Sequence, residues 1–133
     1  RGQEIVELAD KNKDEELLNI YAYLESVVTG KVSEKTDKKG WNEYQSEKFA
    51  LSYFMGLANK NKYDNPDLAK ALIDFPNSSK IHWVKLNCAK IENKEIKPDL
   101  IKVIKKEFKT LGSDQSRYSY GLKNYFYLLE NEI

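Results

Sequence analysis

Residue types that supply cross-links, metal ligands and tight turns are scarce in this chain of 133 residues. Cys88 is the only cysteine, which excludes an internal disulfide framework and a multi-cysteine zinc site. His82 is the only histidine, which excludes a metal centre built from several histidines. The six glycines are scattered, so there is no glycine-rich loop of the kind that cradles phosphate groups. No apolar run approaches the roughly 20 residues that a membrane-spanning helix needs.

Charged residues are abundant, but the two signs almost cancel: 22 basic and 21 acidic side chains give a net charge of +1. This balance argues against a purely electrostatic nucleic-acid binder. Only Arg1 and Arg117 are arginines, although bidentate recognition of phosphate or guanine favours arginine over lysine. The chain starts at Arg1 rather than at methionine, so we expect a trimmed N-terminus. The balanced charge fits a cytoplasmic protein, and the trimmed start equally fits an exported domain.

What the chain does have is helical periodicity, because apolar residues recur three and four positions apart with little strict alternation. We therefore predict a single all-α domain over residues 1–133, built from about seven helices in antiparallel hairpins. An irregular first hairpin is expected over 1–30, with Asp14 capping its second helix and Gly30 ending it. The polar stretch 31–40 is predicted to be a loop. The expected apolar face of the second helix consists of Leu17, Tyr21, Leu24 and Val28.

The middle of the chain is predicted to hold the core. A long helix is expected over 41–58, and its apolar second half indicates a central helix that is buried on several sides. Pro66 and Pro98 suit the first turns of further helices, and Ser79 is expected to cap the helix between them. A last helix over 116–131 would close the stack. The expected interior positions of these later helices are Leu68, Ala71, Leu72, Phe75, Ile81, Val84, Cys88, Ile91, Ile101, Ile104, Phe108 and Leu111.

An internal repeat relates two parts of this pattern. Shifting the chain by 32 residues aligns Lys48–Phe75 with Lys80–Glu107, and seven of the 28 aligned positions are identical. Pro66-Asp67-Leu68 matches Pro98-Asp99-Leu100 at the start of the second helix of each unit. A period in the low thirties made of two helices is typical of helical-repeat proteins. Two unrelated hairpins that share a generic Pro-Asp helix start would give a similar pattern.

The stretch 41–133 resembles the tetratricopeptide-repeat family. Pro76-Asn77-Ser78-Ser79, then Trp83 and Leu86, is similar to that family's inter-repeat proline and to the aromatic and leucine of its first helix. Met55-Gly56 is similar to its Leu-Gly pair, whereas Asn87 follows Leu86 where the family has glycine. Ala69 and Phe75 are similar to the small and aromatic positions of its second helix. The resemblance implies a short right-handed α-solenoid, with stacked hairpins over 41–112 and the 116–131 helix as a cap.

No catalytic or cofactor-binding constellation is visible in the sequence. His82 and Cys88 are six residues apart, about 240° around a helix, so they cannot form a nucleophile–base pair on one helix. Cys88 shares an apolar stripe with Val84 and is expected to be a small buried hydrophobe. We therefore predict a protein that is not an enzyme and binds no metal or cofactor. A basic face, either solvated or directed to an anionic partner, consists of Lys102, Lys105, Lys106 and Lys109.

The predicted function is a non-catalytic protein–protein interaction module that binds a peptide or a helix of a partner. The resemblance implies a binding surface on the first helices of the units, at Ser52, Asn59, His82, Lys85 and Glu92. Another candidate surface, for a partner or a second copy, is one face of the last helix, with Tyr120, Asn124 and Tyr127. One alternative is a small inhibitor or immunity-type protein that caps a toxin or enzyme. Another is a helical ligand-binding domain, because a pocket between helices leaves no sequence signature.

Overall fold

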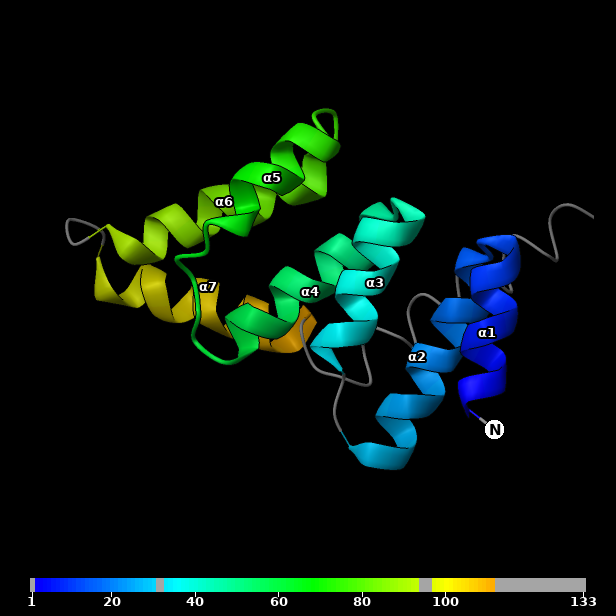
Figure 1. The fold of residues 1–133 in the computed structure, drawn as a ribbon. Coiled ribbons are helices and arrows are strands. Elements are labelled where there is room, and N and C mark those ends of the chain that lie inside the picture. The colour runs from blue at the N-terminus through cyan, green and yellow to red at the C-terminus, as the bar shows by residue number, and fades with distance from the viewer. Residues whose placement is uncertain (1, 31–32, 94–96, 112–133) are drawn as a thin grey trace, which may run out of the picture.

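The computed structural model describes residues 2–30, 33–93 and 97–111, without the side chains of 107 and 109–111. Every regular element in these ranges is an α-helix, so the all-α prediction is confirmed there. Figure 1 shows α1 and α2 at one end of the molecule, α3 and α4 in the middle, and α5, α6 and α7 at the other end. The seven helices are α1 (Gly2–Asn12), α2 (Glu15–Thr29), α3 (Glu34–Tyr44), α4 (Glu47–Asn59), α5 (Asp67–Asp74), α6 (Ser79–Glu92) and α7 (Pro98–Leu111).

Helix α2 has the predicted ends and half of the predicted inner face, because Leu17 and Tyr21 are partly buried and pack against a hydrophobic cluster. Asp14 accepts a hydrogen bond from the backbone N–H of Leu17 at 3.1 Å, and Gly30 ends the helix in the left-handed conformation with φ of +75°. Leu24 and Val28, expected to face inward, are exposed. The reason is that α2 packs through a narrower face with smaller side chains. The buried residues on that face are Leu18, Asn19, Ala22 and Ser26.

The predicted loop over 31–40 is wrong for the residues that are described there. Helix α3 begins at Glu34, and the Ser33 side chain caps it by accepting from the backbone N–H of Thr36 at 3.3 Å. The predicted single helix over 41–58 is also wrong, because Gln45 adopts a left-handed conformation and ends α3. Ser46 then caps α4 by accepting from the backbone N–H of Phe49 at 3.3 Å.

Helix α4 is the central helix, as predicted for the second half of that segment. It packs against α3, α6 and α7. Its buried residues lie on every side of the helix and are Phe49, Ala50, Ser52, Tyr53, Phe54, Met55, Leu57 and Ala58. Most of them belong to the main hydrophobic core, whereas Phe49 points into a second, smaller cluster with residues of α1 and α2.

The later helices agree closely with the sequence-based expectations. Eight of the expected interior residues are buried or pack against the core on α5, its C-cap residue Phe75 and α6, and Ile104 and Phe108 do so on α7. Ile101 is half-buried, and the side chain of Leu111 lies outside the described residues. The cap of α6 is Ser78 rather than Ser79, because the Ser78 hydroxyl reaches the backbone N–H of Ile81 at 3.2 Å.

The helices follow one another at a nearly constant spacing. Helices α2, α4 and α6 begin at Glu15, Glu47 and Ser79, which are 32 residues apart. Helices α1, α3, α5 and α7 begin at positions 2, 34, 67 and 98. The strongest packing partner of α1 is α2, and that of α3 is α4, while α5 packs against α6. This pairing differs from the predicted one, which joined the 41–58 segment to the helix after Pro66, because α3 was not expected.

Two equivalent hydrogen bonds repeat at the same spacing. The Ser46 hydroxyl donates to Oε1 of Glu15 at 2.7 Å, and the Ser78 hydroxyl donates to Oε1 of Glu47 at 2.7 Å. In both cases the N-cap serine of one helix contacts the first-turn glutamate of the helix 32 residues earlier. The start of α2 is therefore joined to that of α4, and the start of α4 to that of α6.

Candidate interaction surface

The structure places the predicted partner-binding residues in different environments. Ser52 is only 9% exposed in the centre of α4, so a partner at the surface does not reach it. Asn59 is exposed, but it is the last residue of α4 and therefore lies on a different helix from the three predicted residues of α6. His82, Lys85 and Glu92 are all exposed on α6. The remaining predicted residues, Tyr120, Asn124 and Tyr127, lie outside the described part of the chain.

An exposed stripe runs along α6 and contains the three predicted residues of that helix. His82, Lys85 and Glu92 are spaced by three and seven positions, so they share one side of an α-helix. Two apolar residues complete this α6 stripe: Leu86, which is 55% exposed, and Ala89. The opposite side of the helix faces the core through Ile81, Val84 and Cys88. The stripe therefore combines an accessible aliphatic side chain with charges of both signs.

His82 is held by the turn that precedes its own helix. Its Nε2 atom lies 2.9 Å from the carbonyl oxygen of Pro76. Because a carbonyl oxygen only accepts, this contact requires a proton on Nε2. The imidazole is thereby oriented at the first turn of α6, where it forms one end of the stripe.

A shallow, open depression of about 500 Å³ adjoins the far end of the stripe. Glu92 is shared by the stripe and the depression. The Glu34 carboxylate at one edge forms an ion pair with Lys60 at 2.9 Å, and this hydrogen bond lowers the pKa of Glu34. The lining residues are Glu34, Tyr53, Leu57, Asn61, Lys62, Tyr63, Asp64, Asn65, Pro66 and Glu92.

The two tyrosines of the depression are anchored by hydrogen bonds. The Tyr53 hydroxyl donates to Oδ2 of Asp67 at 3.2 Å, and the Tyr63 hydroxyl donates to Oδ1 of Asn61 at 3.1 Å. Burial raises the pKa of Tyr63, so its hydroxyl stays protonated and remains a donor. The sequence did not predict this site, because the site forms where the 60–66 connection meets the ends of three helices. The asparagines that flank this connection were the available signal, since they are typical of turns.

Cys88 lies on the buried side of α6. It is 6% exposed, and burial raises the pKa of its thiol to about 11, with a further contribution from the charge of Glu92. A thiol with this pKa is protonated near neutral pH, and the thiolate is the reactive form. The interpretation of Cys88 as a small buried hydrophobe is confirmed.

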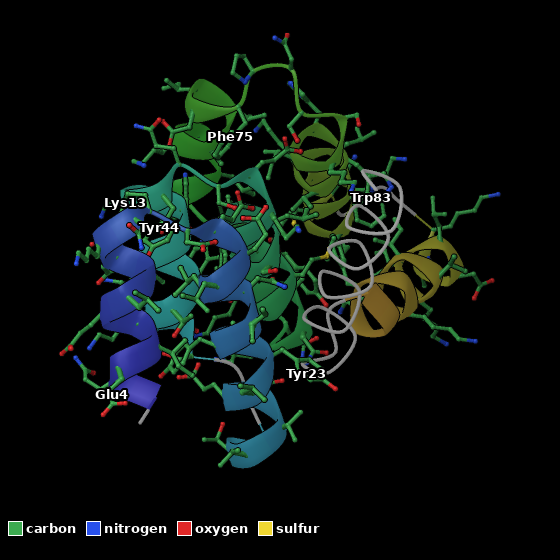
Figure 2. All side chains as sticks on the ribbon, turned by 90° about the vertical axis from the view of Figure 1, so that its right-hand side faces the viewer. Glu4, Lys13, Tyr23, Tyr44, Phe75 and Trp83 are labelled. Carbon is green, nitrogen blue, oxygen red and sulfur yellow. The ribbon has the colours of Figure 1, made fainter. Side chains whose placement is uncertain are left out.

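A second set of polar side chains joins α1, α3 and α5. The Tyr44 hydroxyl donates to Asp10 at 2.6 Å, and Lys39 forms an ion pair with Asp10 at 2.9 Å. At the next junction, Trp41 Nε1 donates to Asp74 at 2.9 Å. Lys13 lies over the Tyr44 ring, 5.2 Å from its centroid, and the two side chains are neighbours in Figure 2. These side chains form hydrogen bonds and an ion pair with one another, so we interpret them as contacts that hold the helices together and not as a partner-binding surface.

Other classes of site are not indicated by the described residues. Within the ranges that the structure covers, no group of three or more His, Cys, Asp or Glu side chains could hold a metal ion. No helix in those same ranges is long and apolar enough to cross a membrane. No protein-family model, curated protein or solved structure matches this chain.

Proposed function

We propose that this protein is a non-catalytic interaction module, built as a TPR-like helical-repeat stack, that binds a segment of a partner protein along the α6 stripe. The observation that carries this proposal is the stripe itself. It presents Leu86 near the middle of its length, with Lys85 next to Leu86 in the sequence and Glu92 at the far end. The 32-residue spacing of the helix starts supports a stack of similar hairpins, and such stacks offer extended surfaces to peptides and helices.

The chemistry of the stripe defines the kind of segment that would fit. An exposed leucine favours an apolar anchor on the partner, because burying both side chains removes apolar area from water. Lys85 favours an acidic group near that anchor, and Glu92 favours a basic group about two helical turns further on. The partner segment would therefore be amphipathic, with a defined direction along α6, and its basic end would reach the depression.

The first experiment is capture of partners from native lysate by the tagged protein, read by mass spectrometry. Leu86→Glu and Lys85→Glu test the stripe. Lys80→Glu is the matched control, because Lys80 is exposed on the same helix but lies on the other side. The purified partner is then titrated by calorimetry against each variant, and circular dichroism checks that each variant is folded.

We expect one dominant protein that binds the unmodified chain and Lys80→Glu equally. Leu86→Glu should weaken this binding about a hundredfold and Lys85→Glu about tenfold, in line with a central anchor and a flanking charge. Equal binding by all four proteins would contradict the proposal. A co-purified small molecule, with no protein partner for any variant, would also contradict it and would assign the depression to a ligand.

A further inference from the structure

Acidic and basic residues are separated along the chain although the total charge is nearly zero. Residues 2–30 contain seven acidic side chains and two lysines, whereas residues 79–111 contain nine lysines and four acidic side chains. The first range holds α1 and α2, and the second holds α6 and α7. Figure 1 shows these two pairs of helices at opposite ends of the molecule. The part of the protein that the structure describes therefore has an acidic end and a basic end.

The acidic end exposes an aliphatic surface in the last two turns of α2. Leu24, Val27 and Val28 are 44%, 50% and 82% exposed. Their spacing places them on neighbouring positions of one helix side, and Glu16 lies on the same side two turns earlier. Within the described ranges, no lysine forms an ion pair with Glu16. This α2 patch therefore combines clustered apolar side chains with the carboxylate of Glu16, which forms no ion pair within the described residues.

The basic end has a complementary surface on α7. Leu100 and Val103 are 43% and 55% exposed. Lys102, which precedes Val103 in the sequence, is exposed about 100° around the helix from it. Among the residues that the structure describes, no carboxylate forms an ion pair with Lys102. This α7 patch thus has the same kind of apolar surface as the α2 patch, with a charge of the opposite sign.

We propose that the α2 patch of one molecule docks onto the α7 patch of a second copy, so that molecules associate head to tail. The two patches lie at opposite ends of one molecule and do not touch each other, but the patches of two copies in the same orientation can meet (Figure 1). Contact buries aliphatic groups on both sides and brings Glu16 towards Lys102, which guides the encounter electrostatically. Because the two patches differ, each dimer retains one free patch of each kind. Association therefore continues into a chain or closes into a ring.

Sedimentation velocity, from low micromolar to submillimolar protein, tests the association. We expect oligomers that grow with concentration and become smaller at high salt, since exposed charge pairs are screened. Val28→Glu should weaken association at least about tenfold. Ile73→Glu is the matched control, because Ile73 is 79% exposed but lies on α5, outside both patches. A monomer at every concentration, or equal loss in both variants, would overturn the proposal.

A charge-reversal pair tests the head-to-tail geometry. Glu16→Lys and Lys102→Glu should each weaken self-association, because each places like charges opposite one another. An equimolar mixture of the two should associate again, since unaltered Lys102 of one variant meets unaltered Glu16 of the other. A mixture that stays monomeric, or a Lys102→Glu protein that associates like the unmodified chain, would overturn the head-to-tail arrangement. Neither result depends on the binding partner proposed for the α6 stripe.

Discussion

Two hydrophobic clusters hold this protein together, and they differ greatly in size and composition. The main cluster contains fifteen buried residues from α3 through α7, among them Trp41, Phe54 and Phe108. The smaller cluster, where α1 and α2 meet α3 and α4, has four: Ala9, Leu18, Ala22 and Phe49. Buried apolar area sets most of the stabilisation, so α1 and α2 gain much less from their cluster than the later helices gain from theirs.

Polar contacts compensate for the smaller cluster. Glu25 accepts from the backbone N–H of Ser33 at 3.2 Å and from the Thr36 hydroxyl at 3.3 Å, which ties α2 to the start of α3. Asp10 and Glu15 bind α3 and the start of α4 in the same way. Helices α1 and α2 are therefore attached to the rest of the protein largely by hydrogen bonds and ion pairs, whereas the later helices are held by apolar packing. We therefore expect the first hairpin to open at lower free energy than the rest.

Replacing one phenylalanine in each cluster should have the largest effect. Phe49→Ala and Phe108→Ala should each lower the free energy of unfolding by about 3–5 kcal/mol, the usual range for a buried phenylalanine. Phe49→Ala should release mainly α1 and α2, while Phe108→Ala should weaken all of α4 to α7. Hydrogen exchange read by mass spectrometry distinguishes these results. Equal loss of protection across the chain in Phe49→Ala would refute the division into two clusters.

A smaller effect is expected at Gly40, where α3 touches Phe49. A Cβ atom added to Gly40 would overlap the Phe49 ring, so Gly40→Ala should cost about 1–3 kcal/mol by overpacking. Without this contact, alanine in a helix stabilises by roughly 0.5–1 kcal/mol relative to glycine. A Phe49→Ala background removes the ring atoms but keeps the Cβ of residue 49, which would lie 2.6 Å from the added atom, so the cost of Gly40→Ala should fall without vanishing. Urea unfolding of the four proteins gives this double-mutant cycle, and an unchanged cost would contradict the proposed contact with the ring.

The two N-cap serines should have nearly equal effects although they serve different clusters. Ser46→Ala and Ser78→Ala should each cost about 1 kcal/mol, because each removes a cap and a hydrogen bond to a glutamate. Thr29→Ala, at an exposed helix end, is a control for loss of a hydroxyl. Thermal unfolding measures all three. A much larger loss for one serine would show that the two junctions are not equivalent.

The smallest effect concerns pH at the junctions of α1, α3 and α5. The hydrogen bond from Lys70 lowers the pKa of Asp74 below its ordinary value of 3.8, and the bond from Trp41 also lowers it. A lowered pKa in the folded state stabilises the protein above pH 3.8, and this contribution is lost as the pH falls through the folded-state pKa. Asp74→Asn should therefore be less stable at neutral pH and less sensitive to acid.

Asp10 provides the corresponding test at the other junction. Burial raises the pKa of its carboxyl, but hydrogen bonds from Tyr44 and Lys39 outweigh burial, so the net shift is downward. Asp10→Asn should flatten the acid dependence in the same direction. Urea unfolding of both variants between neutral and acidic pH measures the effect. An acid dependence like that of the unmodified protein would contradict a stabilising role for the carboxylate concerned.

The sequence predicted the later helices well because their buried positions are apolar and regularly spaced. Ile81, Val84 and Cys88 are examples, and the prolines mark where the flanking helices begin. Helix α3 was missed because its buried residues include Thr36, Asp37 and Gly40, which give no hydrophobic period. Two sequence signals pointed to α3: the capping residue Ser33 at its start and the 32-residue spacing between helix starts.

The candidate site was also predicted only in part from the sequence. His82, Lys85 and Glu92 could be placed on one helix side from their spacing alone, and the structure confirms this. Ser52 looked equally polar and accessible in the sequence, but α4 is surrounded by other helices. The depression depends on how the 60–66 connection folds back between helix ends, which no local pattern specifies.

The serine–glutamate bonds have a consequence for how unfolding would spread. One hydroxyl in each pair accepts from its own helix and donates to the preceding hairpin, so a single atom belongs to both a local cap and a long-range contact. If the preceding hairpin opens, the serine loses its partner and the next helix start is less firmly held. The unfolding of one hairpin would then destabilise mainly the hairpin next to it, as expected for a row of two-state elements that are coupled only to their nearest neighbours.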